Sequence, residues 1–308
     1  MAKVNIESII SPDTIVVKKP KKRIFSRIAY YFSGTIMSLI FLFPIFYMLA
    51  ASTKTEEAYA QSIGTIMMFI PDFSNVSTWF DNYSVIFGEY NIWQYALNSI
   101  IYAAIVIVLN ILINGLAAYA LAKLKFPGNK FFRFIILFLI VVPVETSIIP
   151  LYSICKTMLG LKGAFSVMAV IMPASISVFN IFLFIQFFTS IPSEFQEAAR
   201  IDGANTLTIF FKIILPLSKP IIATVAVFCF IGVWNDYLWP AMVLPYAQDG
   251  EYSLLPIQAA LTTIQSIEGV TTGQIMASLV VTSLPIFIVY IVAQKYIVKG
   301  FGTAGLKI

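Results

Sequence analysis

Two carboxylic acids, Asp236 and Glu145, lie inside long apolar stretches of this 308-residue chain. A charged side chain in the middle of a bilayer costs about 2.5–3.5 kcal/mol even on lenient insertion scales, and such groups usually face an interior cavity. Asp236 is flanked by Trp234, Asn235 and Tyr237. Carboxylate and amide groups hydrogen-bond to hydroxyls, and aromatic rings offer flat apolar surfaces. The cluster therefore suits a ligand rich in hydroxyl groups, such as a sugar passing through a membrane.

Each carboxylic acid also has a structural interpretation. Asp236 is open to two roles, a group on a solute pathway or a hydrogen-bonding link to a neighbouring helix, and its surroundings slightly favour the pathway. Glu145 lies between Pro143 and Pro150, on a span that these prolines are expected to break. For Glu145, a position near the outer membrane interface is at least as strong an interpretation as a pathway role.

The composition excludes most enzyme classes. Hydrophobic residues make up 59% of the chain and charged residues 11%, against about 45–50% and 25% in soluble domains. Histidine is absent, which removes the commonest metal ligand and general base. Cys155 and Cys229 have no metal-binding spacing and read as small apolar residues. We therefore expect no catalytic residue, no metal site and no cofactor bound by this chain.

Six stretches are long and apolar enough to cross a hydrocarbon core of roughly 30 Å, which takes about 20 helical residues. Their apolar residues are continuous rather than alternating, unlike the strands of a membrane barrel. The sequence therefore predicts an all-α, polytopic membrane protein with six transmembrane helices. The predicted spans cover residues 28–52, 94–122, 134–155, 163–193, 220–248 and 269–294.

The distribution of Lys and Arg predicts the orientation of these spans, because basic residues stay on the cytoplasmic side. Of the 20 basic residues, 17 lie in the terminal segments 1–27 and 295–308 and in the connections 123–133 and 194–219. Both termini are therefore expected in the cytoplasm. The basic residues are spread between apolar blocks, which argues against a nucleic-acid partner.

Two segments are expected on the outer side. Residues 53–93 are long enough for a small cap, and their aromatic residues include Trp93, which we assign to the membrane interface. A short helix is expected at 254–262. Within the spans, Asn110 and Asn114 share one helix face, as do Ser177 and Asn180, and hydrogen bonding between helices is the favoured role for all four.

The connection at 191–219 carries the most specific pattern. Ser193 followed by Gln196 matches a capping box, which predicts that a helix begins there. Gly203 is placed where a left-handed residue would end this helix. A second helical stretch is expected over 206–215, ending at Pro216.

The first of these helices is predicted to present one side to a groove on another protein. A membrane-surface helix is the less favoured interpretation, because large apolar residues are few and a basic stripe is missing. The predicted contact side combines an aromatic residue with small ones, which allows close approach: Phe195, Ala198, Ala199 and Asp202.

The same connection resembles the EAA loop of ATP-binding cassette importer permeases. The resemblance rests on Glu197-Ala198-Ala199, then Asp202-Gly203-Ala204, then Ile213-Ile214-Leu215-Pro216. Other segments are similar to the sugar-importer branch, of the maltose permease G subunit type; they include Asn98-Ser99, Phe126-Pro127-Gly128 and the run from Trp234 to Pro240. The resemblance covers roughly residues 28–308.

This resemblance implies a type I importer permease that passes a carbohydrate, expected to be an oligosaccharide. It implies a second permease subunit of similar fold, two copies of a cytoplasmic ATPase and an extracytoplasmic sugar-binding protein. The chain lacks a GxxxxGK[ST] loop, so ATP and Mg²⁺ are expected on the ATPase. The residues implied in coupling to the ATPase are Phe195, Glu197, Ala198, Ala199, Asp202, Gly203 and Ala204.

The sequence thus predicts a basic cytoplasmic tail (1–27) and a six-helix permease domain (28–308) with a coupling loop at 191–219, in a bacterial or archaeal cell membrane. An ion-coupled secondary transporter is the alternative, since it too needs carboxylates within the membrane. Such proteins often contain internal repeats, and no repeat is visible here. The docking loop also argues for the ATP-driven importer.

Overall fold

The computed structural model describes residues 24–245 and 253–304, which form helices and turns with no strand among them. The chain divides into two compact units, residues 1–46 and 47–308. Helix α1 (Ile24–Ser52) supplies the described part of the first unit and continues into the second. Its apolar side chains are largely exposed within the first unit, with Phe41 at 76%, a surface that lipid tolerates. Most of the predicted tail (1–27) lies outside the described residues.

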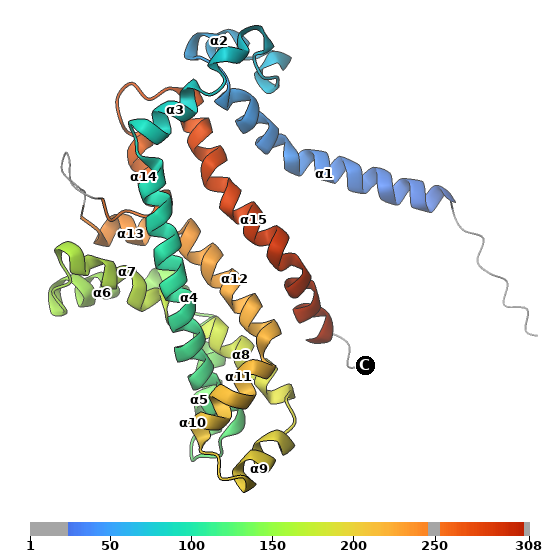
Figure 1. Cartoon of the computed structure of the whole chain (residues 1–308), viewed down its shortest axis with the longest axis vertical. Coiled ribbons are helices and arrows are strands. Elements are labelled where there is room, and N and C mark those ends of the chain that lie inside the picture. The colour runs from blue at the N-terminus through green and yellow to red at the C-terminus, as the bar shows by residue number, and fades with distance from the viewer. Residues whose placement is uncertain (1–23, 246–252, 305–308) are drawn as a thin grey trace, which may run out of the picture. The chain divides into compact units, whose positions relative to one another are not determined.

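The second unit is a set of helices of very different lengths (Figure 1). Short 3₁₀ turns (Ile66–Phe69, Phe73–Thr78, Val144–Ser147, Gly163–Phe165) and two π-helical turns (Ile154–Met158, Phe210–Ile214) connect or interrupt them. The α-helices are α2 (Glu56–Ser62), α3 (Asp81–Gly88), α4 (Ile92–Lys123), α5 (Asn129–Ile140), α6 (Ile148–Ser153), α7 (Ser166–Ala174), α8 (Val178–Ser190), α9 (Glu194–Ile201), α10 (Thr206–Ile209), α11 (Leu215–Leu217), α12 (Lys219–Asn235), α13 (Leu238–Val243), α14 (Ile257–Gln265) and α15 (Thr272–Ala304).

Within residues 24–245 and 253–304, three helices are single, unbroken candidates for membrane spans by length and composition: Arg27–Ser52 in α1, all of α4, and Thr272–Gln294 in α15. These match the first, second and sixth predicted spans. Three further candidates are bent pairs of helices, which brings the number to six if each pair is one span. The prediction of an all-α polytopic chain is confirmed.

The first of the three bends has a local cause. Between α5 and the segment Val144–Met158 the chain turns by 98°, at the break expected around Pro143, whose ring cannot continue a helical hydrogen-bond ladder. The pair formed by Gly163–Ala174 and α8 bends by 42°, and α12 turns 82° from the segment Thr206–Leu217. Hydropathy alone detects the length of these spans. It does not reveal the 42° bend, which lies inside the fourth predicted span.

The fifth predicted span also differs from the structure. Its helix, α12, ends at Asn235, and Asp236 follows in an extended conformation before α13 begins. Asp236 is therefore placed in a break between two helices, which corrects its predicted position inside one continuous helix. Residues 246–248 of that predicted span lie outside the described residues.

Helix α4 is the central element of the packing, with α8 and α12 against it and α15 against α12 (Figure 1). Polar residues join these helices. The Asn180 amide donates to Asn110 Oδ1 at 3.0 Å, and the Asn114 amide donates to the Ser175 carbonyl at 3.1 Å. The Ser177 backbone N–H donates to Asn114 Oδ1 at 3.2 Å. The predicted hydrogen bonding between helices is confirmed for the side chains of Asn110, Asn114 and Asn180. The Ser177 side chain instead caps α8, where it accepts from the Asn180 N–H at 3.2 Å.

The predicted cap is present and contains α2 and α3. Its centre is Lys54, which is 3% exposed and donates to the Met67 carbonyl at 2.6 Å and to Ser62 Oγ at 3.2 Å. Burial lowers the pKa of the Lys54 ammonium, and nearby Asp72 opposes that shift. The predicted short helix after residue 253 is also found, as α14.

The cap packs closely against the start of α15, where the backbone of Gly273 approaches the side chain of Asn82. The Asn82 amide donates to the carbonyls of Ser52 and Lys54, both at 2.9 Å. A β-carbon on Gly273 would lie 2.5 Å from Asn82 Nδ2 and 2.7 Å from the Lys54 carbonyl oxygen. Only glycine fits at this position without movement of the cap.

We predict that Gly273→Ala lowers the stability of the purified chain by about 1–3 kcal/mol, the usual cost of overpacking. Gly88→Ala is the matched control, because a β-carbon there meets nothing within 4 Å. Thermal unfolding in mild detergent measures both variants. Equal midpoints for the two variants would contradict the close contact at Gly273.

Candidate functional site

The connection predicted to dock on a partner forms a helix, a sharp turn and a second helical segment. Its first helix, α9, begins at Glu194 as predicted, but the capping box is not formed. Ser193 has helical backbone angles (φ −71°, ψ −21°) and its side chain makes no capping bond, since a capping side chain requires an extended residue. The Ser193 carbonyl instead accepts from the N–H groups of Gln196 (2.9 Å) and Glu197 (3.1 Å).

The end of α9 is a complete Schellman motif, as the position of Gly203 predicted. Gly203 has φ +81°. The Ala204 N–H donates to the Ala199 carbonyl at 2.9 Å, and the Gly203 N–H donates to the Arg200 carbonyl at 3.0 Å. This pair of bonds satisfies the last carbonyls of the helix. The turn therefore depends on a left-handed residue at Gly203.

The exposed side of α9 differs from the predicted one by one residue. Phe195 and Ala198 are exposed as expected, with Phe195 at 49%. Ala199 is buried in the chain's own core, so its predicted place on the contact side is wrong. Ile201 is 87% exposed instead. The i, i+3, i+6 spacing from Phe195 through Ala198 to Ile201 is the sequence signal that was missed.

The remaining predicted coupling residues surround this surface. Glu197, Asp202 and Gly203 are exposed, whereas Ala204 is half-buried and packs against the same core as Ala199. Helix α9 thus has one face packed on the chain's own core and one face exposed. Leu207, which follows the turn, adds a further exposed apolar side chain at 58%.

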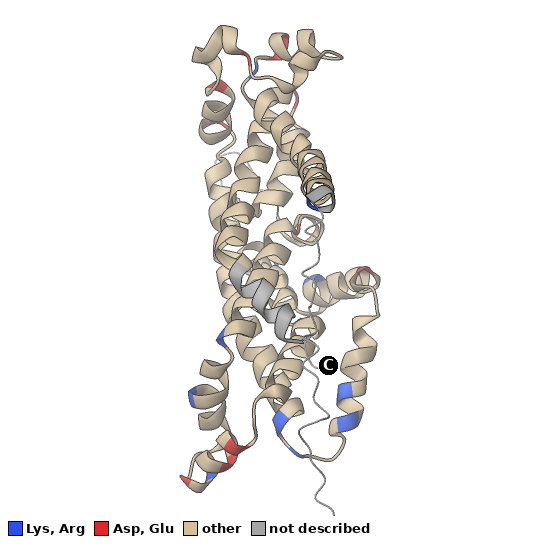
Figure 2. Cartoon of the chain, turned by 90° about the vertical axis from the view of Figure 1, so that its right-hand side faces the viewer, with Lys and Arg blue, Asp and Glu red and all other residues tan. Residues whose placement is uncertain are grey.

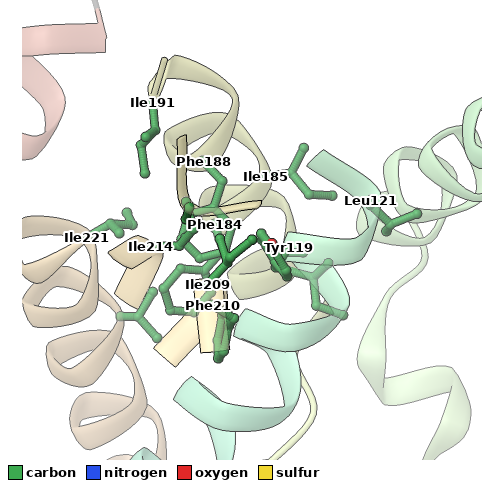
Figure 3. Close-up of a cluster of buried hydrophobic side chains, with 14 of the residues drawn as sticks. Tyr119, Leu121, Phe184, Ile185, Phe188, Ile191, Ile209, Phe210, Ile214 and Ile221 are labelled. Carbon is green, nitrogen blue, oxygen red and sulfur yellow. The ribbon is translucent and has the colours of Figure 1, made fainter. Parts of the chain in front are cut away.

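The second helical segment is wedged into the membrane helices (Figure 3). It comprises α10, the π-helical turn and α11, and it includes Pro216 rather than ending before it. Ile209, Phe210 and Ile214 are completely buried in a cluster with residues of α4, α8 and α12. The Phe210 ring lies 5.4 Å from the Tyr119 ring of α4. The segment that follows α9 is therefore held by packed side chains of three helices.

A cavity of about 360 Å³ lies where two helix breaks face α4. One break separates α7 from α8, and the other separates α12 from α13. Irregular backbone at membrane depth is tolerated only where protein buries it or where it lines a cavity. Asn110, Ser177, Asn180 and Asp236 supply the polar lining. Among the described residues, Asn110 Nδ2 has no hydrogen-bond partner.

A second cavity, of about 470 Å³, contains both predicted carboxylic acids. Glu145 and Asp236 line it together with Ser147 and Trp239. Asp236 therefore lines both cavities. Its carboxylate accepts a long bond (3.4 Å) from the Trp239 N–H, and the Trp239 indole donates to the Ala169 carbonyl at 2.9 Å. Two residues 91 positions apart in the sequence thus share one concave surface.

The other predicted pathway residues are placed differently. Trp234 is completely buried, stacks on Phe230 at 5.4 Å and donates to the Thr282 carbonyl at 3.0 Å. Its role is packing α12 against α15, which corrects the predicted pathway position. Asn235 and Tyr237 are exposed at the break and line neither cavity.

Comparison with known proteins agrees with this architecture. Residues 114–302 match the family described as "Binding-protein-dependent transport system inner membrane component". The arabinooligosaccharides transport system permease protein AraQ of Halalkalibacterium halodurans is 32% identical over 88% of this chain and 93% of its own length. The sn-glycerol-3-phosphate transport system permease protein UgpE of Salmonella typhimurium is 32% identical over 87% and 94%.

A solved structure is similar over the same extent. It is the crystal structure of a bacterial ABC transporter involved in the import of the acidic polysaccharide alginate. Its matching chain has a TM-score of 0.71 and 28% sequence identity, over 89% of this chain and 96% of that chain. The helical fold described above is therefore shared with a chain of a bacterial ABC transporter.

We predict that Phe210→Ala destabilises the chain by roughly 3–5 kcal/mol, because it empties a completely buried site. Phe211→Ala is the control: the neighbouring ring is 44% exposed, and its loss should change stability by about 0.5 kcal/mol or less. Thermal unfolding in mild detergent distinguishes them. Similar midpoints for the two variants would show that Phe210 does not anchor this segment.

Proposed function

The chain belongs to the family of binding-protein-dependent transport system inner membrane components, and from that premise we propose that it forms half of the transmembrane pathway of an ATP-driven carbohydrate importer. It is a multi-pass membrane permease of the kind found in sugar importers. We propose an oligosaccharide as the solute, because relatives are named for arabinooligosaccharides and diacetylchitobiose, and the similar structure is named for alginate.

We propose that the chain works with a second permease subunit of similar fold, two copies of a cytoplasmic ATPase and an extracytoplasmic sugar-binding protein. ATP and Mg²⁺ are assigned to the ATPase. The observation that carries this proposal is the two-sided character of α9. One face, with Ala199 and Gln196, is buried in the chain, and the other offers Phe195 and Ile201. An exposed aromatic beside small residues is the pattern of a helix that enters a partner's groove.

The proposed coupling follows from the packing behind α9. A partner that moves α9 pulls on the Schellman turn at Gly203 and then on the wedge at Phe210. Phe210 contacts Tyr119, and a β-carbon on Gly115 would lie 3.4 Å from its ring. Because packed interiors transmit displacement, α4 and the cavity that it lines respond to the ATPase. Phe195, Glu197, Ala198, Ile201 and Asp202 are the residues proposed to touch the partner.

The two cavities are the proposed solute pathway in this subunit. Asp236 and Glu145 offer hydrogen-bond acceptors, Asn110 Nδ2 offers a donor without a partner among the described residues, and Trp239 offers an aromatic ring. Sugars need donors, acceptors and flat apolar surfaces together. We propose that the second permease subunit completes the pathway.

The proposed orientation places α9 in the cytoplasm. Lys and Arg (blue) mark the end of the second unit where α9 lies and α5 begins, and Asp and Glu (red) occur more in the cap (Figure 2). Basic residues favour the cytoplasmic side. A bacterial or archaeal cell membrane is the proposed location, with both termini in the cytoplasm.

A second candidate function, ion-coupled transport, is favoured by one observation: Glu145 and Asp236 line the same cavity. Paired carboxylic acids within a membrane are common in proton and cation pathways. The two functions are separated by purifying the tagged chain in mild detergent and identifying its companions by mass spectrometry. Recovery of a second permease and an ATPase, with ATP-dependent uptake, supports the importer. A lone chain whose uptake follows an ion gradient contradicts it.

We predict that Gly203→Val weakens recovery of the ATPase with the chain and slows transport, because β-branched residues strongly disfavour φ +81°. The cost is local to the turn, since a β-carbon at Gly203 meets no other part of the described chain within 4 Å. Gly203→Asn is the control, because asparagine accepts the left-handed conformation. Unchanged ATPase recovery and transport in the valine variant would contradict coupling through this turn.

We predict that Asp236→Ala lowers uptake roughly tenfold or more while the complex still assembles, because a charge-assisted hydrogen bond to the solute is lost. Asn235→Ala is the control, since the neighbouring side chain lines neither cavity. Uptake into vesicles and recovery of all subunits are measured together. Loss of assembly in the alanine variant would instead assign Asp236 to helix packing.

A further inference from the structure

A third concave site lies outside the coupling surface and outside the two cavities. It has a volume of about 750 Å³ and lies between the connection after α4, the start of α5 and the start of α9. Four cationic side chains line it, and no carboxylate does. We call it the basic pocket and define it by Lys123, Lys125, Lys130, Arg133 and Gln196.

Two of the four cations shape the pocket, and two are available to a ligand. Arg133 Nε donates to the Leu121 carbonyl at 2.9 Å, and Lys123 donates to the Ile191 carbonyl. Lys125 and Lys130 are exposed, and no hydrogen bond to a described residue holds their ammonium groups. Glu194 lies close enough to Lys123 to interact with it electrostatically, and it is outside the lining.

The pocket also contains the first turn of a helix of 12 residues, α5. Gly128 precedes this helix with φ +87°, and no side chain caps the first N–H groups. The Asn129 N–H donates to the Phe126 carbonyl at 3.3 Å. The following N–H groups of the first turn and the positive end of the helix dipole favour an anion at this position.

An independent observation comes from Gln196, which reaches the pocket from α9. Its side chain is 3% exposed, and its Nε2 has no hydrogen-bond partner among the described residues. A buried donor without a partner costs about 1–3 kcal/mol, so a ligand that accepts a hydrogen bond here recovers that cost. The side-chain atoms of the pocket that have no partner among the described residues, the two lysine ammonium groups and Gln196 Nε2, are donors.

We propose that the basic pocket binds the phosphate group of an anionic phospholipid from the inner leaflet. Donors and cations without a lining carboxylate select an anion, and basic pockets beside membrane helices on the cytoplasmic side bind lipid head groups. Phe126 and Phe131 are exposed beside the pocket, at 36% and 63%, where they can meet acyl chains. The lipid assignment relies on the orientation proposed above; the choice of an anion does not.

The site has a consequence for the coupling segment. Gln196 lies on the first turn of α9, whereas the two lysines lie at the corner between α4 and α5, Lys125 on the connection and Lys130 on the first turn of α5. A bound phosphate therefore joins these two parts of the chain, and anionic lipid stabilises the seating of α9.

The test is native mass spectrometry of the full chain in mild detergent, titrated with phosphatidylglycerol, with phosphatidylcholine and with inorganic phosphate. We expect retention of phosphatidylglycerol over phosphatidylcholine. Replacing two lysines should weaken this binding roughly 30-fold, at the usual contribution of each basic residue. The test variant is Lys125→Gln with Lys130→Gln. The control is Lys212→Gln with Lys219→Gln, which removes the same charge from exposed positions outside the pocket.

A second variant separates the site from general charge effects. Gln196→Met keeps the length of the side chain and removes the donor without a partner. We expect unchanged or higher thermal stability without lipid and weaker retention of phosphatidylglycerol. Three outcomes would overturn the proposal: equal retention of the two lipids, equal losses in the test and control double variants, or saturable binding of inorganic phosphate without any lipid preference. None of these readouts involves transport, so they stand apart from the test of the importer.

Discussion

The arrangement of the membrane helices depends on how Asn114 satisfies the backbone at the break between α7 and α8. A peptide group without a partner in hydrocarbon costs several kcal/mol. The Asn114 amide donates to the Ser175 carbonyl, and its oxygen accepts from the Ser177 N–H. One side chain on α4 thus serves both sides of the break. The hydrogen bond from Asn180 to Asn110 then fixes the start of α8 against α4, and the cavity lies beside this pair.

The long helix α4 connects the two sites that the proposed function needs, the cavity and the packed segment behind α9. Asn110 lines the cavity, the Tyr119 ring packs on the ring of Phe210, and a β-carbon on Gly115 would lie 3.4 Å from that ring. Asn110 and Gly115 are five residues apart, which is about 7.5 Å along a helix axis. In the coupling proposed above, a partner that acts on α9 therefore works on the same stretch of helix that shapes the cavity. Because these residues are close together and densely packed, the proposed coupling between α9 and the cavity needs no long series of intermediate residues.

The sequence predicts the features that depend on local chemistry. The lengths of α1, α4 and α15 follow from continuous apolar runs, the break near Pro143 follows from ring geometry, and the left-handed turn at Gly203 follows from residue type. The burial of Ala199 and Trp234 was not predictable in this way. Both positions depend on which neighbouring helix covers them, and a helical repeat does not identify the neighbour.

Other errors have the same origin in tertiary structure. The residues around Asp236 are as apolar as a continuous span requires, so hydropathy gave no sign that α12 ends at Asn235. The capping box at Ser193 matched by residue type and failed because the backbone there is already helical. Glu145 and Asp236 were each recognised, but their common cavity depends on two bends that bring distant segments together.

The π-helical turn Phe210–Ile214 determines how this segment responds to the insertion or deletion of a residue. Ile209 and Ile214 are five residues apart, which in an α-helix of 3.6 residues per turn would place them about 140° apart around the axis. Both are completely buried here, because the wider turn, with its i to i+5 bonds, brings them toward one side. Inserting or deleting a single residue would rotate α9 away from its seat, whereas many substitutions at exposed positions would leave it in place. The length of this segment therefore matters more than its exposed residues. The number of residues from Gly203 to Pro216 determines how α9 is oriented on the core.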